Sequence, residues 1–262
     1  MNRADSNKSG GAVFETCPEI PLVPEEVPRP FWSVMVPTYN CRPAYLRNAL
    51  ESVLRQDPGL DRMQIEVIDD HSTRCNPLSI VRQVGKGRIG YHRHPDNRGA
   101  TRTFNTCIRR SRGHWVHILH DDDAVLPGFY SACEESIREH NGLSMVTCPA
   151  ISFDEAGRWT DLLDGGSRIA IRGILKQAQR ELARRNFVCC PAVAMRRGVY
   201  EKTGGFDTSL FHAADWEMWM RAASVGLVGF LDRPYILYRR HSDSDTSRLV
   251  RMGENIDRKS VV

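Results

Sequence analysis

The stretch His114-Trp-Val-His-Ile-Leu-His-Asp-Asp-Asp-Ala-Val-Leu-Pro127 joins a short apolar run to three consecutive acids. The run from Trp115 to Leu119 is long enough for a buried strand, and Pro127 begins a helical pattern. The acids therefore follow the carboxyl end of a strand, which is where ligands bind in open α/β sheets. Three adjacent carboxylates repel one another, and a divalent cation is the simplest compensation. The alternative is that they only cap the following helix.

The chain before this stretch alternates between strand and helix patterns. Predicted strands cover 31–37, 65–68, 89–92 and 115–119. Helical spacing covers 45–56 and 78–84, and 97–105 is a loop that enters a further helix. Polar residues gather at the carboxyl end of each strand. This alternation predicts an α/β fold with a Rossmann-like, mostly parallel central sheet flanked by helices.

The pattern after residue 150 is less regular. A strand pair is expected around Gly157, a basic amphipathic helix over 171–185 and a strand over 187–195. A helix over 213–223 and a last strand over 227–238 follow. A membrane-surface role for the basic helix is an alternative to an ordinary solvated face.

Proline content and polarity suggest the limits of the domain. Residues 1–30 are polar and then Pro-rich, which predicts a flexible leader. Residues 31–247 form one expected domain, and residues 248–262 form a polar tail. At 41% apolar content, the chain can bury a substantial core.

Composition narrows the range of partners and compartments. The formal net charge is +4, and 31 of the 36 basic residues are Arg, which favours bidentate contacts to phosphate or carboxylate. No block of consecutive basic residues indicates a nucleic-acid tail. The eight Cys form no Cys-x-x-Cys pair, which favours a reduced, cytoplasmic setting. Neither a signal pattern nor an apolar run long enough for a membrane span is evident, although peripheral membrane association stays open.

Five motifs, in order, resemble those of the inverting glycosyltransferases of family two, which have the GT-A fold. The resemblance covers residues 31–247, with 31–126 as the nucleotide-sugar half and 127–247 as the acceptor half. The motifs are Val36-Pro-Thr-Tyr-Asn40, Ile68-Asp-Asp-His-Ser72 with Asn97 to Asn105, the acidic triplet, Ala213-Ala-Asp-Trp-Glu-Met-Trp219 and Tyr238-Arg-Arg-His241.

The resemblance implies a role for residues in each motif. The implied catalytic base is Asp215, although Ala214 stands where the family has Glu. The implied metal ligands, for Mn²⁺ or Mg²⁺, are Asp122, Asp123 and His241. The implied nucleotide-binding residues are Pro37, Tyr39, Asn40, Asp70, Asn97, Arg102 and Asp121.

The register of the acidic motif has two solutions. Literal Asp-x-Asp spacing selects Asp121 and Asp123. Counting back five residues from Pro127 selects Asp122 as the principal ligand and puts His120 where a first Asp is usual. We favour Asp122, with Asp121 near the ribose or the metal.

The resemblance implies metal-dependent transfer of a sugar, with inversion, from a nucleotide-diphosphate donor to a hydroxyl or similar nucleophile. The acceptor would be a carbohydrate, a lipid-linked molecule or a small molecule. Because a carboxylate accepts hydrogen bonds from a pyrimidine imide, Asp70 favours a UDP-sugar, with a dTDP-sugar next. One alternative is a non-catalytic sugar-nucleotide-binding protein. Another is a sugar-nucleotide pyrophosphorylase, which would be expected to carry a Gly-rich phosphate loop after the first strand.

Overall fold

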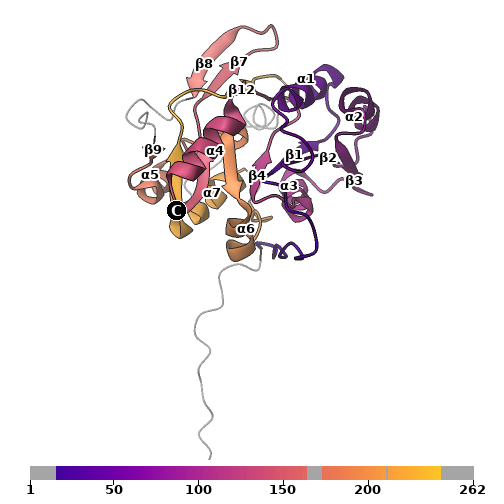
Figure 1. The fold of residues 1–262 in the computed structure, drawn as a ribbon. Helices are drawn as coiled ribbons and strands as arrows, with labels where there is room; N and C mark the ends of the chain where they lie inside the picture. Colours follow the sequence, from indigo (N-terminus) through magenta and orange to yellow (C-terminus); the bar gives the residue numbers. More distant parts are fainter. Residues whose placement is uncertain (1–15, 164–172, 211, 243–262) are drawn as a thin grey trace, which may run out of the picture.

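A computed structural model describes residues 16–163, 173–210 and 212–242, and the main element in these residues is an eight-stranded sheet (Figure 1). Its first half has the order β3-β2-β1-β4, and these strands run parallel. Their bounds are β1 Trp32–Thr38, β2 Met63–Asp69, β3 Gly90–Arg93 and β4 Trp115–Ile118. The predicted α/β fold with a mostly parallel sheet is confirmed.

The sheet continues beyond β4 with strands of mixed direction. Strand β10 is antiparallel to both β4 and β6, β11 is parallel to β6, and β9 is antiparallel to β11. The bounds are β6 Leu143–Thr147, β9 Gly173–Ile174, β10 Val193–Arg196 and β11 Leu227–Phe230. Strand β6 was not predicted from the sequence.

Helices cover both faces of the main sheet. Side chains of β1 alternate between two buried clusters: Val34 and Val36 belong to the cluster that contains α1, whereas Met35 belongs to the cluster that contains α3 and α7. Both faces are therefore apolar, as a parallel sheet requires. The helices are α1 Pro43–Leu54, α2 Pro77–Gly85, α3 Ala100–Arg110, α4 Phe129–Glu139, α5 Ala178–Arg184, α6 Arg197–Thr203 and α7 Ala214–Val225.

A second, four-stranded sheet has the order β5-β12-β7-β8, and its β7–β8 hairpin is at the top of Figure 1. The hairpin confirms the strand pair expected around Gly157. Strand β12 is antiparallel to β5 and parallel to β7. The bounds are β5 Ala124–Val125, β7 Ala150–Phe153, β8 Trp159–Leu163 and β12 Ile236–Arg239.

Three element predictions were wrong in extent. The strand expected over 227–238 is divided between β11 and β12, because Pro234 lacks an N–H and the two parts pair in different sheets. The strand expected over 187–195 is reduced to β10, preceded by a 3₁₀ turn at Cys190–Ala192 that includes Pro191. The helix expected over 171–185 is the shorter α5; Gly173 has a φ of 130° and belongs to β9, and residues 171 and 172 lie outside the described part.

Residues 16–30 contradict the prediction of a flexible leader, because they pack on the domain. They contain neither helix nor strand, yet the side chain of Ile20 is only 2% exposed. The carbonyl of Pro18 accepts a hydrogen bond from the Gly205 N–H at 2.8 Å. Gly205 is itself pressed against α3, since an added Cβ would lie 2.3 Å from Asn105 Oδ1. The predicted polar tail at 248–262, residues 1–15 and the predicted domain end at 247 lie outside the described residues.

Among the described residues, none of the helices is both long enough and apolar enough to cross a membrane bilayer.

The buried His117 in β4 predicts a loss of stability in acid. Its Nε2 donates to the Pro191 carbonyl at 2.8 Å, so Nδ1 accepts from the Tyr130 hydroxyl at 3.1 Å. Burial lowers the pKa of His117 from 6.5 to about 4. The unfolded chain therefore binds an extra proton between these two pH values. The part of the free energy of unfolding that depends on neutral His117 is at its full value above pH 6.5. It falls as the pH drops toward 4, by up to about 3 kcal/mol.

Urea unfolding at pH 7.5, 6 and 5 measures this slope. The variant His117→Gln has no titratable group at this position and should lose that part of the slope. An equal pH dependence in the variant and in the parent protein would assign the slope to other groups.

Candidate active site

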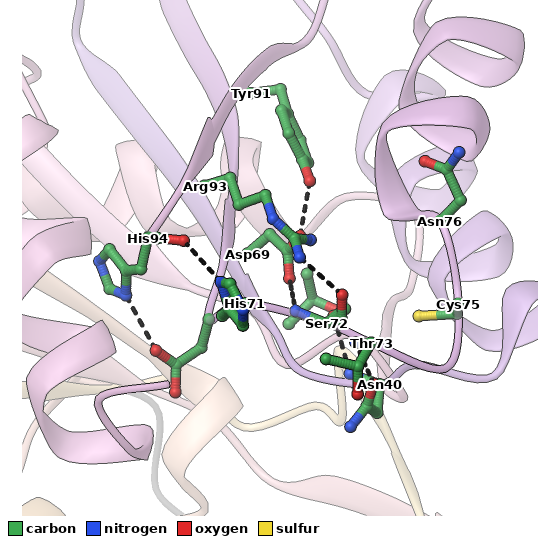
Figure 2. A network of polar contacts seen from close by, with 12 residues as sticks. Asn40, Asp69, His71, Ser72, Thr73, Cys75, Asn76, Tyr91, Arg93 and His94 are labelled. Carbon is green, nitrogen blue, oxygen red and sulfur yellow. Dashed lines mark hydrogen bonds and ion pairs between the residues drawn. The ribbon is translucent and has the colours of Figure 1, made fainter. Parts of the chain in front are cut away.

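Asn40 joins the loop after β1 to the loop after β2. It lies in the left-handed region with a φ of 51°, which Asn tolerates. Its N–H donates to Ser72 Oγ at 2.8 Å, and its Oδ1 accepts from the backbone N–H groups of Thr73 and Arg74, both at 2.8 Å (Figure 2). The Asn40 amide oxygen therefore fixes the loop after β2, and its two hydrogen bonds are to that loop.

The two neighbours of Asn40 that were expected to bind nucleotide differ in exposure. Pro37 lies in the fully buried strand β1, where it pairs with Ile68. Tyr39 is 50% exposed, so its ring is accessible to a ligand at this sheet edge.

Asp69 anchors the second loop from inside the sheet. Its carboxylate accepts from the Ser72 N–H at 2.8 Å, from the Tyr91 hydroxyl at 2.6 Å and from the Arg93 guanidinium (Figure 2). Burial opposes ionisation of Asp69, but these hydrogen bonds outweigh it and hold the pKa below the usual value. The loop that carries Asp70 is thereby fixed. Sequence reasoning did not assign this role to Asp69.

The Asp70 carboxylate accepts hydrogen bonds from the segment that leads into α3. Its Oδ1 accepts from His94 Nδ1 at 2.9 Å and from the Arg98 N–H at 2.8 Å, and its Oδ2 accepts from the Gly99 N–H at 2.8 Å. The side-chain amide of Asn97 donates to the Asp70 carbonyl at 3.3 Å. The sequence motifs at Asp70 and Asn97 thus meet, as the prediction of one site requires.

Arg102 is exposed and lines a cleft of about 280 Å³. The lining of this cleft includes Pro18, Arg109 and Arg98, whose N–H donates to Asp70. The acids of the triplet are not among the residues that line it.

Each acid of the triplet has a different partner. The Thr38 hydroxyl donates to Asp121, and His241 Nε2 lies 2.8 Å from Asp122 Oδ2. The backbone N–H of Arg239 donates to Asp123 Oδ1 at 2.8 Å. The residue pairs that meet here are 83, 119 and 116 positions apart in the chain.

The three acids have different pKa values in these surroundings. Burial raises the pKa of Asp121 to about 7, and the charge of Asp122 adds to this shift. Burial and the charge of Asp122 also raise the pKa of Asp123. Burial opposes ionisation of Asp122 as well, but the His241 hydrogen bond and the charges of His120 and His241 leave its pKa below the usual value. Asp122 is therefore the acid of the three that ionises most readily.

Arg239 supports the triplet from β12. Its guanidinium lies between the rings of Tyr45 and Phe153, at 4.0 and 4.4 Å from their centroids. Its Nε donates to the Asp122 carbonyl at 2.9 Å. Arg239 lies in the motif Tyr238-Arg-Arg-His241, but no role was predicted for it from the sequence, because its partners come from distant segments.

His120, Asp122 and Asp123 form a group that fits a divalent metal. Each offers one ligand atom, and these atoms lie within 4.8 Å of one another. The buried Asp123 Oδ2 has no hydrogen-bond partner among the described residues and lies 3.6 Å from His120 Nδ1. A buried carboxylate oxygen left in this state suits a cation. His241, predicted as a ligand, contacts Asp122, whereas His120 was absent from the predicted ligand set.

Asp215 lies at the amino end of α7 and is half-buried. Its Oδ1 accepts from the Trp216 N–H at 2.6 Å.

Glu217, two residues further along α7, is committed to a structural ion pair. Its two carboxylate oxygens accept from Arg221 Nε and Nη2 at 2.6 and 2.7 Å. Arg221 is only 8% exposed and also donates to the carbonyls of Thr203 and Gly205. Glu217 thus stabilises the turn after α6.

The sheet order, the loops at the carboxyl ends of β1, β2 and β4, and the acid cluster define an α/β protein with a candidate ligand site at its topological switch point. Residues 33–204, more than half of the chain, match the model of "Glycosyl transferase family 2". The chain therefore belongs to glycosyltransferase family 2 and is a nucleotide-sugar-dependent glycosyltransferase. The family match decides against the pyrophosphorylase alternative.

Related sequences agree with this family. The protein MT1568 of Mycobacterium tuberculosis is 24% identical over 89% of this chain and 75% of its own length. A chondroitin synthase of Escherichia coli is 26% identical over 75% of this chain, which spans only 27% of the synthase.

Solved structures confirm the GT-A fold. TarS of S. aureus, solved with UDP-GlcNAc, superposes with a TM-score of 0.69 at 20% identity, over 82% of this chain and 60% of that chain. The mannosyltransferase PcManGT of Pyrobaculum calidifontis, solved with GDP-Man and Mn²⁺, has a TM-score of 0.60 at 20% identity, over 88% of this chain and 62% of its own.

Substitutions in the triplet should rank Asp122 and Asp123 as metal ligands. We expect Asp122→Ala to weaken Mn²⁺-dependent nucleotide binding by on the order of tenfold or more, because it removes the most readily ionised acid. Asp123→Ala should weaken this binding less, and should also lower the melting temperature by a few degrees, because it leaves the Arg239 N–H without its acceptor. Calorimetric titrations with and without EDTA, together with thermal melts, measure both effects. Equal or reversed losses of metal-dependent binding would refute this register.

Proposed function

We propose that this protein is a metal-dependent, inverting glycosyltransferase that uses a UDP-sugar. The observation that carries the proposal is the acid cluster at the carboxyl end of β4, next to the loops that follow β1 and β2. TarS, a relative in fold, was solved with UDP-GlcNAc, and PcManGT was solved with Mn²⁺. These relatives support both a nucleotide-sugar donor and a divalent metal.

Asp122 and Asp123, with His120, are the residues that would hold the metal. When bound, Mn²⁺ or Mg²⁺ would neutralise the charge that develops on the diphosphate leaving group. His241 keeps Asp122 ionised and oriented, and Asp121 is held by Thr38 beside the donor. Arg239 fixes the main chain of the metal-binding loop through the Asp122 carbonyl.

Asp70 is the proposed contact for the nucleotide base. A carboxylate offers about four acceptor positions. Protein donors use three of them, with Oδ2 accepting only the Gly99 N–H. The remaining position on Oδ2 suits the imide N–H of uracil. Guanine would present two adjacent donors, its N1–H and its amino group, and the second would need an acceptor position on Oδ1, which already accepts from His94 and the Arg98 N–H.

Asp215 is the proposed general base. It accepts the proton of an acceptor hydroxyl while that oxygen forms a bond to the anomeric carbon and the nucleoside diphosphate leaves. A single displacement inverts the anomeric centre and needs one base, and Asp215 is the carboxylate that the motif Ala213-Ala-Asp-Trp-Glu-Met-Trp219 offers for it. The name of the chondroitin synthase relative supports a carbohydrate acceptor. Lipid-linked and small-molecule acceptors are further candidates, to be tested alongside carbohydrate acceptors.

The donor proposal predicts an order of nucleotide affinities. We expect UDP to bind most tightly, dTDP next and GDP least, in the presence of Mn²⁺, because Asp70 pairs with a pyrimidine imide. Isothermal titration with the three diphosphates measures this order. Tighter binding of GDP would contradict the assignment of Asp70.

The base proposal predicts opposite phenotypes for two acids of α7. Asp215→Asn should reduce turnover by on the order of a hundredfold or more, with melting temperature and donor affinity close to the parent protein, because Asn accepts the Trp216 hydrogen bond but cannot take a proton. The matched control Glu217→Gln should keep turnover and lose several degrees of melting temperature, because Arg221 loses its buried counter-charge.

Release of UDP from UDP-sugars in the presence of candidate acceptors measures turnover. If Asp215→Asn retained most of the transfer rate, the base would be another residue. Donor binding without UDP release, for any acceptor tested, would favour the non-catalytic binding protein, for which the Ala214 substitution is the sequence argument.

A further inference from the structure

Two cysteine thiols meet between the donor loops. The Sγ atoms of Cys41 and Cys75 lie 3.3 Å apart, although the residues are 34 positions apart in the chain. Both are free, with Cys41 buried at 7% exposure and Cys75 half-buried. A disulfide bond is about 2 Å long, so these sulfurs are in contact without being bonded.

The backbone on both sides of the pair is already held in place. Cys41 directly follows Asn40, and Cys75 directly follows Arg74, whose N–H donates to Asn40 Oδ1. Thr73 donates to the same oxygen, and Figure 2 shows Cys75 next to this network. The short distance between the two thiols is therefore a consequence of the hydrogen bonds by which Asn40 joins the two loops.

We propose that Cys41 and Cys75 are a dithiol modification site, which a small disulfide oxidant converts into an intramolecular disulfide that weakens donor binding. The effect on donor binding rests on the function proposed above, whereas formation of the disulfide does not.

The chemistry is thiol–disulfide exchange in two steps. The Cys75 thiolate attacks one sulfur of the oxidant RS–SR, forms a mixed disulfide and releases RS⁻. Cys41 Sγ, 3.3 Å away, then loses its proton to solvent, attacks Cys75 Sγ and releases the second RS⁻. The two thiols give up two electrons and two protons, and the oxidant is reduced to two RSH.

The other described cysteines are less suited to this reaction. Cys107, Cys133 and Cys148 are fully or almost fully buried. Burial raises the pKa of the Cys189 and Cys190 thiols, and it raises that of Cys41 as well. What distinguishes the Cys41–Cys75 pair is the contact between its two sulfurs and the partial exposure of Cys75, which makes Cys75 the attacking thiol.

The disulfide would disturb the donor site through two links. Closing the gap to bonding distance moves the sulfurs together by roughly 1 Å. Cys41 is next to Asn40 in sequence and three residues after Thr38, whose hydroxyl donates to Asp121. We therefore expect oxidation of Cys41 to shift both the Asn40 hydrogen bonds that join the loops and the Thr38–Asp121 contact.

Oxidation of the 262-residue chain with hydroxyethyl disulfide tests the proposal. After remaining thiols are alkylated, non-reducing peptide mapping should recover a Cys41–Cys75 cross-link. The dissociation constant of UDP with Mn²⁺ should rise at least about threefold on oxidation and return after dithiothreitol. Cys75→Ser should lose both responses, whereas the matched control Cys17→Ser should keep them.

Absence of the cross-link in the parent protein would overturn the modification site. A cross-link with an unchanged UDP dissociation constant, or an equal change in Cys75→Ser, would overturn its effect on the donor site. Failure of the reduced protein to bind UDP would instead overturn the donor assignment and, with it, the effect on binding. The peptide map decides on the disulfide in either case, because it needs no nucleotide.

Discussion

The crowding of three carboxylates at the end of β4 is the constraint on which the rest of the site depends. Asp121, Asp122 and Asp123 are consecutive, so their mutual repulsion cannot be relieved by separation. The fold relieves it with a separate partner for each acid: the Thr38 hydroxyl, the His241 ring and the Arg239 N–H. The result is one readily ionised acid between two whose pKa values are raised.

The small second sheet supplies two of these three partners. Strand β5 begins directly after the triplet and pairs with β12, which carries Arg239 and leads into His241. Stability and chemistry are thereby coupled, because the strand that pairs with β5 also brings the hydrogen-bond partners of Asp122 and Asp123 to the triplet. The ring of Tyr45 on one side of Arg239 and that of Phe153 on the other hold the guanidinium in this position.

The donor side is built by polar contacts between loops. Asn40 links the loop after β1 to the loop after β2, and Asp70 links the latter to the entry of α3. A ligand at this edge would meet a surface that is held before it binds, which limits the ordering cost of association. The same closeness of the loops brings Cys41 and Cys75 into contact.

Sequence periodicity predicted the first half of the fold well, because parallel strands buried on both faces are apolar runs that end in polar loops. It failed at 227–238, where one apolar run serves two sheets, and at 16–30, where Pro-rich sequence packs without regular structure. Pro234, which lacks an N–H, is a local signal for the first case, whereas Ile20 has none, since its burial depends on the surface it meets.

The sequence by itself determined the fold class, the family and the motifs that contribute to the site, because these depend on residue type and order. Only the tertiary structure decided that His120 joins Asp122 and Asp123, that His241 supports Asp122, and that Arg102 lines a cleft to which the acids of the triplet do not contribute. It also committed Glu217 to Arg221. The physical reason is that a side chain's pKa and role depend on burial and on partners from distant strands, and chain folding alone brings those partners together.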